Sequence, residues 1–99
     1  MGVPEMTDEE QIARLRVDID SIDNKLVELL NERARLALKI GIAKGGKDIV
    51  RPDREQAVMN NISAANKGPL ADEGLQEIFK KIISICRQIQ FNRDHKTNI

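Results

Sequence analysis

Apolar residues from Ile12 onward recur at alternating steps of three and four, which is the spacing of one face of an α-helix. Upstream, Thr7 and Glu10 have the spacing of a capping box, and the pair Gly45-Gly46 follows the last apolar position. The pattern therefore predicts a helix from Asp8 to Lys44, about 54 Å long. The apolar positions on this face, here called the apolar seam, are Ile12, Leu15, Ile19, Ile22, Leu26, Leu29, Leu36, Ile40 and Ala43.

Two shorter helices are predicted after the first. Pro52 is suited to the first turn of the second helix, which the Asn-Lys-Gly-Pro stretch at 66–69 ends. A third helix is expected from about Ala71 to Phe91. No segment has a convincing strand pattern, so we expect an all-α domain over residues 8–91, with a flexible leader at 1–7 and a flexible tail at 92–99.

The length of the first helix has a consequence for assembly. A chain of 99 residues with 40% hydrophobic content and only two aromatic side chains has too little other apolar surface to cover the apolar seam. A second copy of the chain, packed with its long helix antiparallel, would cover it. We therefore expect three helices of unequal length that form an intertwined homodimer.

Charge and cysteine content exclude several classes of function. The sixteen basic and sixteen acidic residues balance, so no overall field favours nucleic acid or an acidic membrane surface. One cysteine and one histidine, Cys86 and His95, provide neither a disulfide framework nor a metal-ligand set. With no targeting pattern or membrane-spanning apolar run, we expect a cytoplasmic protein.

Several polar side chains lie on faces that are otherwise apolar. Arg33 is a polar residue at a position that the three- and four-residue spacing of the apolar seam includes. Lys44, eleven residues later, projects from nearly the same face. The inner face of the second helix begins at Arg54 and Glu55, and the apolar stripe of the third ends at Gln90. Two inward cations favour an anion in a cavity. Alternatively, Arg33 sets the register of packing, and the other residues are solvated at helix ends.

Arg16 and Cys86 complete the set of candidates. Arg16 lies seventeen residues before Arg33, about 25 Å along the same helix, so the two cannot share a small site within one chain. An antiparallel partner helix could bring them together. Cys86 fits a small buried hydrophobe better than a nucleophile, because the folded region contains no histidine to activate it.

From Ile12 to Gln90 these residues resemble the all-helical class of chorismate mutases, most closely the mutase domain of bifunctional chorismate mutase/prephenate dehydratases. The landmarks are Leu15-Arg16, Ile19-Asp20-Ser21-Ile22-Asp23, Asn31-Glu32-Arg33, Ala37 to Gly41, Ala43-Lys44, Arg51-Pro52-Asp53-Arg54-Glu55, Asn66-Lys67-Gly68-Pro69-Leu70, Ile78-Phe79 and Ile82-Ile83-Ser84-Ile85-Cys86.

The resemblance implies a role for each candidate residue. Carboxylate groups of chorismate would be bound by Arg33 and by Arg16 of the other subunit, and Arg54 would line the site. The ether oxygen would be addressed by Lys44 and Gln90, and the substrate hydroxyl by Glu55.

Two further positions that would contact the substrate depart from the best-known members of the family. Arg51 stands where those members have aspartate, and Cys86 stands where they have serine.

The implied reaction is the pericyclic rearrangement of chorismate to prephenate, in the biosynthesis of phenylalanine and tyrosine. This reaction requires no cofactor, metal or covalent intermediate, and it suits a pocket that selects one conformer and stabilises developing negative charge. Two alternatives remain. One is an isochorismate-pyruvate lyase on the same fold, and the other is a non-catalytic helical dimerisation module.

Overall fold

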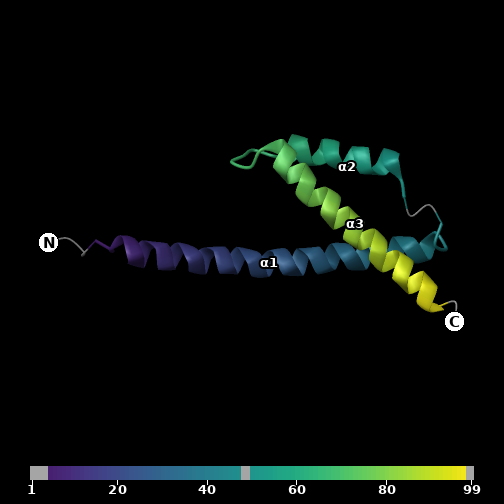
Figure 1. Ribbon diagram of the computed structural model, residues 1–99, viewed down its shortest axis with the longest axis horizontal. Coiled ribbons are helices and arrows are strands. Elements are labelled where there is room, and N and C mark those ends of the chain that lie inside the picture. The colour runs from purple at the N-terminus through teal and green to yellow at the C-terminus, as the bar shows by residue number, and fades with distance from the viewer. Residues whose placement is uncertain (1–4, 48–49, 98–99) are drawn as a thin grey trace. The chain divides into compact units, whose positions relative to one another are not determined.

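The computed structural model describes residues 5–47 and 50–97, with side chains described as far as residue 90. It contains three helices, α1 (Asp8–Ala43), α2 (Pro52–Ala65) and α3 (Asp72–Thr97) (Figure 1). No strand occurs among the described residues, and the prediction of an all-α fold is confirmed. The chain consists of two compact units, Met1–Glu32 and Arg33–Ile99.

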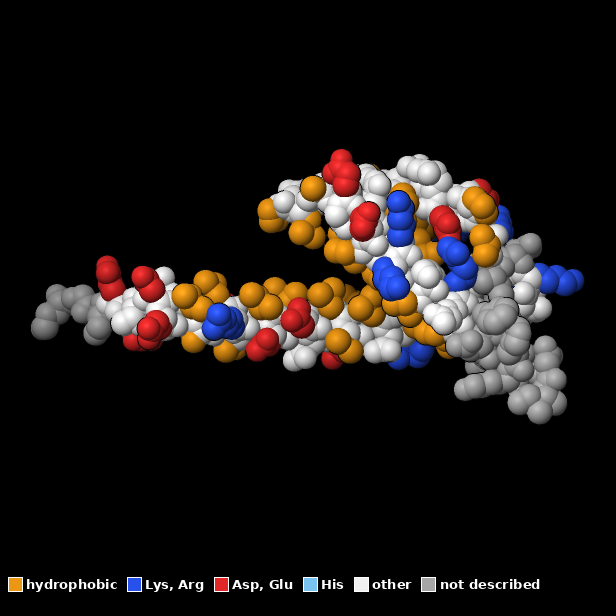
Figure 2. All heavy atoms as spheres, in the orientation of Figure 1, with side chains coloured by type: hydrophobic (Ala, Val, Ile, Leu, Met, Phe, Trp, Pro, Cys, Tyr) orange, Lys and Arg blue, Asp and Glu red, His pale blue; other side chains and the backbone are white. Residues whose placement is uncertain are grey.

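The unit Met1–Glu32 contains the first part of α1. Thr7 caps the helix as predicted, because its Oγ1 accepts a hydrogen bond from the Glu10 backbone N–H at 3.1 Å. The Thr7 hydroxyl also donates to Glu10 Oε1 at 3.2 Å. Figure 2 shows hydrophobic side chains along this part of α1, and the six seam residues from Ile12 to Leu29 are between 47% and 60% exposed. Within this unit the apolar seam is therefore an uncovered surface.

The unit Arg33–Ile99 begins inside α1 and contains the end of that helix. Gly45 and Gly46 have φ angles of 65° and 75°, in the left-handed region that glycine adopts without a steric penalty. The Gly46 N–H donates to Gly41 O at 3.0 Å, which satisfies a carbonyl of the last helical turn. The helix ends at Ala43, one residue earlier than predicted, so Lys44 lies in the turn.

Helices α2 and α3 pack against each other and are joined by a turn. The Asn66 side chain organises this turn, because its Nδ2 donates to Leu70 O at 2.9 Å and to Asp72 Oδ1 at 2.6 Å. Across the hairpin, Gln76 Nε2 donates to Ser63 Oγ at 3.0 Å. The two buried apolar side chains of this unit, among those described, are Met59 and Cys86.

The third helix is longer than predicted. It starts at Asp72 and continues to Thr97, whereas its end was predicted at Phe91. Ile78, one of its apolar residues, is 50% exposed. The predicted flexibility of residues 1–7 and 92–99 stays a prediction, and residues 1–4 and 98–99 lie outside the described part of the chain. Within that part, no helix combines the length and apolarity needed to cross a membrane.

Candidate active site

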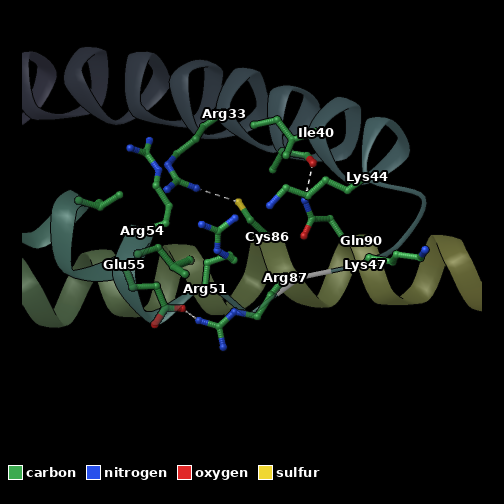
Figure 3. Close-up of a pocket in the computed structure, with 14 residues that line it drawn as sticks. Arg33, Ile40, Lys44, Lys47, Arg51, Arg54, Glu55, Cys86, Arg87 and Gln90 are labelled. Carbon is green, nitrogen blue, oxygen red and sulfur yellow. Dashed lines mark hydrogen bonds and ion pairs between the residues drawn. The ribbon is translucent and has the colours of Figure 1, made fainter.

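A cavity of about 140 Å³ lies within the unit Arg33–Ile99, between the end of α1, the start of α2 and the C-terminal half of α3 (Figure 3). All seven candidate residues that the sequence places in this unit line it, although they come from three helices and from the segment between α1 and α2. They are Arg33, Lys44, Arg51, Arg54, Glu55, Cys86 and Gln90.

Arg33 is held at the cavity by the third helix. Its Nη1 donates to the Sγ of Cys86 at 3.3 Å, and the thiol is buried. In Figure 3 the side chains of Arg33 and Lys44 point from α1 and its terminal turn into the space between the helices. Both side chains are half-buried, as expected for cations on an inward face.

Gln90 is fixed where α3 crosses the end of α1. Its Nε2 donates a hydrogen bond to the backbone carbonyl of Ala37. Gly41 makes room for this side chain: a Cβ at position 41 would lie 3.2 Å from Gln90 Cγ and 3.3 Å from its Nε2. Glycine inside a helix costs about 1 kcal/mol relative to alanine. At position 41 the missing side chain is what allows the Gln90 amide to approach the helix backbone.

Arg51 and Arg54 flank the start of α2. The guanidinium of Arg51 forms a bidentate ion pair with Asp53, with Nε–Oδ1 at 3.1 Å and Nη2–Oδ2 at 2.9 Å. This pairing lowers the pKa of the Asp53 carboxyl to about 2, with a further contribution from a hydrogen bond to the backbone of Arg54. Arg54 is exposed, and Figure 3 shows its side chain directed toward that of Arg33.

Glu55 forms an ion pair with Arg87 of α3, between Oε1 and Nη2 (Figure 3). Arg87 is not among the site residues predicted from the sequence. The available signal was its spacing, because Arg87 lies four residues after Ile83 and three before Gln90, on the face that lines the cavity.

The cavity wall is strongly basic. Six cationic side chains line it, and Glu55 is the one carboxylate among the described lining residues. The lining cations are Arg33, Lys44, Lys47, Arg51, Arg54 and Arg87. Lys47 points away from the others in Figure 3. Cations concentrated in a partly enclosed hollow favour a small anionic ligand with more than one negative group.

Most of the chain matches a known protein family. Residues 15–91 match the family model for chorismate mutase type II. The chain belongs to this family. The matched residues include every candidate side chain from Arg16 to Gln90.

Individual chorismate mutases give the same result. The bifunctional chorismate mutase/prephenate dehydratase of Neisseria gonorrhoeae is 44% identical over 72 residues, which cover 73% of this chain and 20% of the relative. The chorismate mutase of Methanocaldococcus jannaschii is 33% identical, over 82% of this chain and 85% of its own length. The crystal structure of chorismate mutase from Helicobacter pylori in complex with prephenate has 34% identity and a TM-score of 0.78, covering 83% of this chain and 91% of that one.

The chain spans about a fifth to a quarter of the length of the bifunctional relatives it matches. Within it, the candidates from α2, α3 and the end of α1 meet at one cavity. Arg16 lies in the other unit, Met1–Glu32, and is not among the residues that line the cavity.

Proposed function

We propose that this chain catalyses the rearrangement of chorismate to prephenate. The observation that carries the proposal is the basic cavity, which collects seven of the family's expected site residues in one unit of the chain. Family membership supports the assignment independently of the cavity. Chorismate is a dianion, and its charge is complementary to a wall with six cations and one carboxylate.

The reaction is an intramolecular exchange of bonds. As the ether C–O bond breaks, a C–C bond forms between the ends of the same molecule, and no atom enters or leaves. Negative charge develops on the ether oxygen in the cyclic transition state. Catalysis therefore requires a fixed reactive conformer and hydrogen-bond donors aimed at that oxygen.

Each side chain then has a specific task. Arg33, with Arg54 beside it, binds carboxylate of the substrate, and a guanidinium can do so through two parallel hydrogen bonds. Lys44 and Gln90 donate to the ether oxygen. Glu55 accepts a hydrogen bond from the substrate hydroxyl, because an ionised carboxylate only accepts.

The bond between Gln90 and Ala37 supports the role of Gln90. A primary amide has two N–H donors, and the carbonyl of Ala37 occupies one of them. The second N–H remains available to the ether oxygen, while the first fixes the plane of the amide. A donor that is fixed before the substrate binds loses little energy to reorganisation during the reaction.

The proposal includes a homodimer in which Arg16 of the partner subunit completes each site. The exposed apolar seam supports this assembly, since a surface of six large aliphatic side chains is unfavourable in water and fits a second copy. Sedimentation should then give about twice the chain mass of 11.2 kDa.

The direct test is turnover of chorismate by the purified chain. We expect loss of the chorismate absorbance and formation of prephenate, identified by its acid-catalysed conversion to phenylpyruvate. Isochorismate should be supplied in a parallel reaction. Release of pyruvate from isochorismate without any prephenate from chorismate would replace the proposal with lyase activity.

A second test concerns the shared site. Inactive Arg16→Ala chains mixed with inactive Arg33→Ala chains form about half mixed dimers, each with one intact site, so activity should return to roughly a quarter of wild type. If both arginines served the site of their own chain, every site in the mixture would stay damaged and no activity would return.

A further inference from the structure

Glu55 has a fixed partner that the proposed mechanism does not use. Its Oε1 pairs with Nη2 of Arg87, and this oxygen is shielded from solvent. Both side chains are about one third exposed, at 33% for Glu55 and 30% for Arg87. An ion pair that is partly removed from water is screened less than one on an open surface. The pair is thus able to fix the position of the carboxylate.

The pair also separates two hollows. A second cavity of about 220 Å³ lies between α2 and α3, lined by Pro52, Gln56, Met59 and Lys80. Three residues line both this hollow and the candidate active site: Glu55, Ile83 and Arg87. The Glu55–Arg87 pair is therefore part of the wall between the two hollows. Arg87 reaches Glu55 from α3, whereas Arg51 and Arg54, at the start of α2, line the candidate active site and not the second cavity.

An unrestrained Glu55 would interfere with an anionic substrate. Arg54 is its neighbour in sequence and Arg51 lies one helical turn before it, and both cations line the same cavity. A carboxylate that is free to turn toward these guanidinium groups would compete with the substrate carboxylates for them. Because Asp53 already forms an ion pair with Arg51, the competition concerns Arg54 above all.

We propose that Arg87 is a positioning residue: it holds the Glu55 carboxylate on the α3 side of the cavity, away from the guanidinium of Arg54, which stays available to the substrate. The inference rests on the proposed chorismate mutase function. Arg87 acts through Glu55 and does not itself bind the substrate. Its removal should therefore weaken substrate binding only while position 55 carries a negative charge.

The test is a double-substitution cycle with chorismate as the substrate. Arg87→Met keeps most of the side-chain volume but removes the charge, and Glu55→Gln keeps the shape of Glu55 but removes its charge. We expect Arg87→Met to raise KM about fivefold or more in the wild-type background and less than about twofold in the Glu55→Gln background. Arg87→Lys, which retains a cation, should stay within about twofold of the wild-type KM.

Lys80→Met is the matched control, because Lys80 is a cation of α3 that lines the second cavity and not the first. It should leave KM unchanged. A fivefold rise in both backgrounds would mean that Arg87 attracts the substrate directly, and this result would overturn the proposal. So would an Arg87→Lys variant as impaired as Arg87→Met.

The outcomes separate this inference from the proposed function. A wild-type chain that does not convert chorismate refutes the proposed function. Wild-type turnover with equal effects of Arg87→Met in the two backgrounds refutes only the role of Arg87. If circular dichroism shows that Arg87→Met does not fold, Arg87→Gln replaces it in the same cycle with the same expected values.

Discussion

Gly41→Ala should separate stability from activity in this protein. Gly41 is buried in α1 directly beneath the side chain of Gln90. A methyl group at position 41 would lie 3.2 Å from Gln90 Cγ, 3.3 Å from Nε2 and 3.4 Å from Cδ. Ordinary contacts of a Cβ begin at 3.4 Å, so the glutamine must move by a few tenths of an ångström.

The expected change in folding stability depends on which of the contacted atoms can move. The contacted atoms belong to the flexible end of Gln90 and not to the backbone, so the protein can relieve the contact at small cost in folding energy. Alanine also gains about 1 kcal/mol of helix propensity over glycine. We therefore expect the folding stability to stay the same or to rise by less than about 1 kcal/mol.

Activity should respond in the opposite direction. The movement weakens the hydrogen bond that fixes the Gln90 amide to Ala37 O, and it displaces the donor proposed for the ether oxygen. Misplacement of a catalytic group by about 1 Å can cost a hundredfold in rate, so a shift of a few tenths should cost about tenfold in kcat/KM. KM should change less than kcat, because binding of the carboxylates does not depend on this amide.

Gly74→Ala is the control for the helix effect. Gly74 lies in α3, and a Cβ there would meet no atom within 4 Å. This variant should gain about 1 kcal/mol in urea unfolding and keep wild-type kcat/KM. Gly41→Ala with unchanged kcat/KM, measured beside that control, would show that the position of Gln90 does not limit catalysis and would refute the reasoning.

Two further predictions concern charges at the cavity. Arg33→Ala and Lys44→Ala should each lower kcat/KM by about a hundredfold or more, with the helical circular dichroism retained; unaltered kinetics would assign that cation a structural role. NMR titration should give a pKa of about 2 for the Asp53 carboxyl, and Arg51→Met should raise this pKa toward 3.8. Because the folded-state pKa is the lower one, the stabilisation by Asp53 is present above pH 3.8 and is lost as the pH falls toward 2.

The sequence predicted helix boundaries well where a local signal marks them. Thr7, Pro52 and the glycine pair after α1 are local signals whose effects need no tertiary information, and the structure places helix boundaries beside each of them. The end of α3 was placed at Phe91 because the apolar pattern stops there. Neither glycine nor proline follows, so nothing in the backbone chemistry ends the helix, and it continues to Thr97.

The candidate site was predicted in part from physics and in part from resemblance. Helical spacing identified Arg33, Glu55 and Gln90 as polar groups on inner faces, but it could not show that three helices bring them to one cavity. The partners of these groups were not predicted, because they depend on how α3 crosses the other helices. The bond from Arg33 to Cys86 and the pair of Glu55 with Arg87 are of this kind.

These unpredicted partners have a common physical effect on the polar groups of the cavity. Arg33 is tied to Cys86, Gln90 to Ala37, and Glu55 to Arg87. Each contact involves α3: its Cys86 and Arg87 hold Arg33 of α1 and Glu55 of α2, and its own Gln90 is held by the Ala37 carbonyl of α1. A rearrangement without a chemical nucleophile depends on groups held in place before the substrate arrives. Under the proposed function, the crossing of α3 therefore contributes to catalysis by fixing side chains, in addition to forming one wall of the pocket.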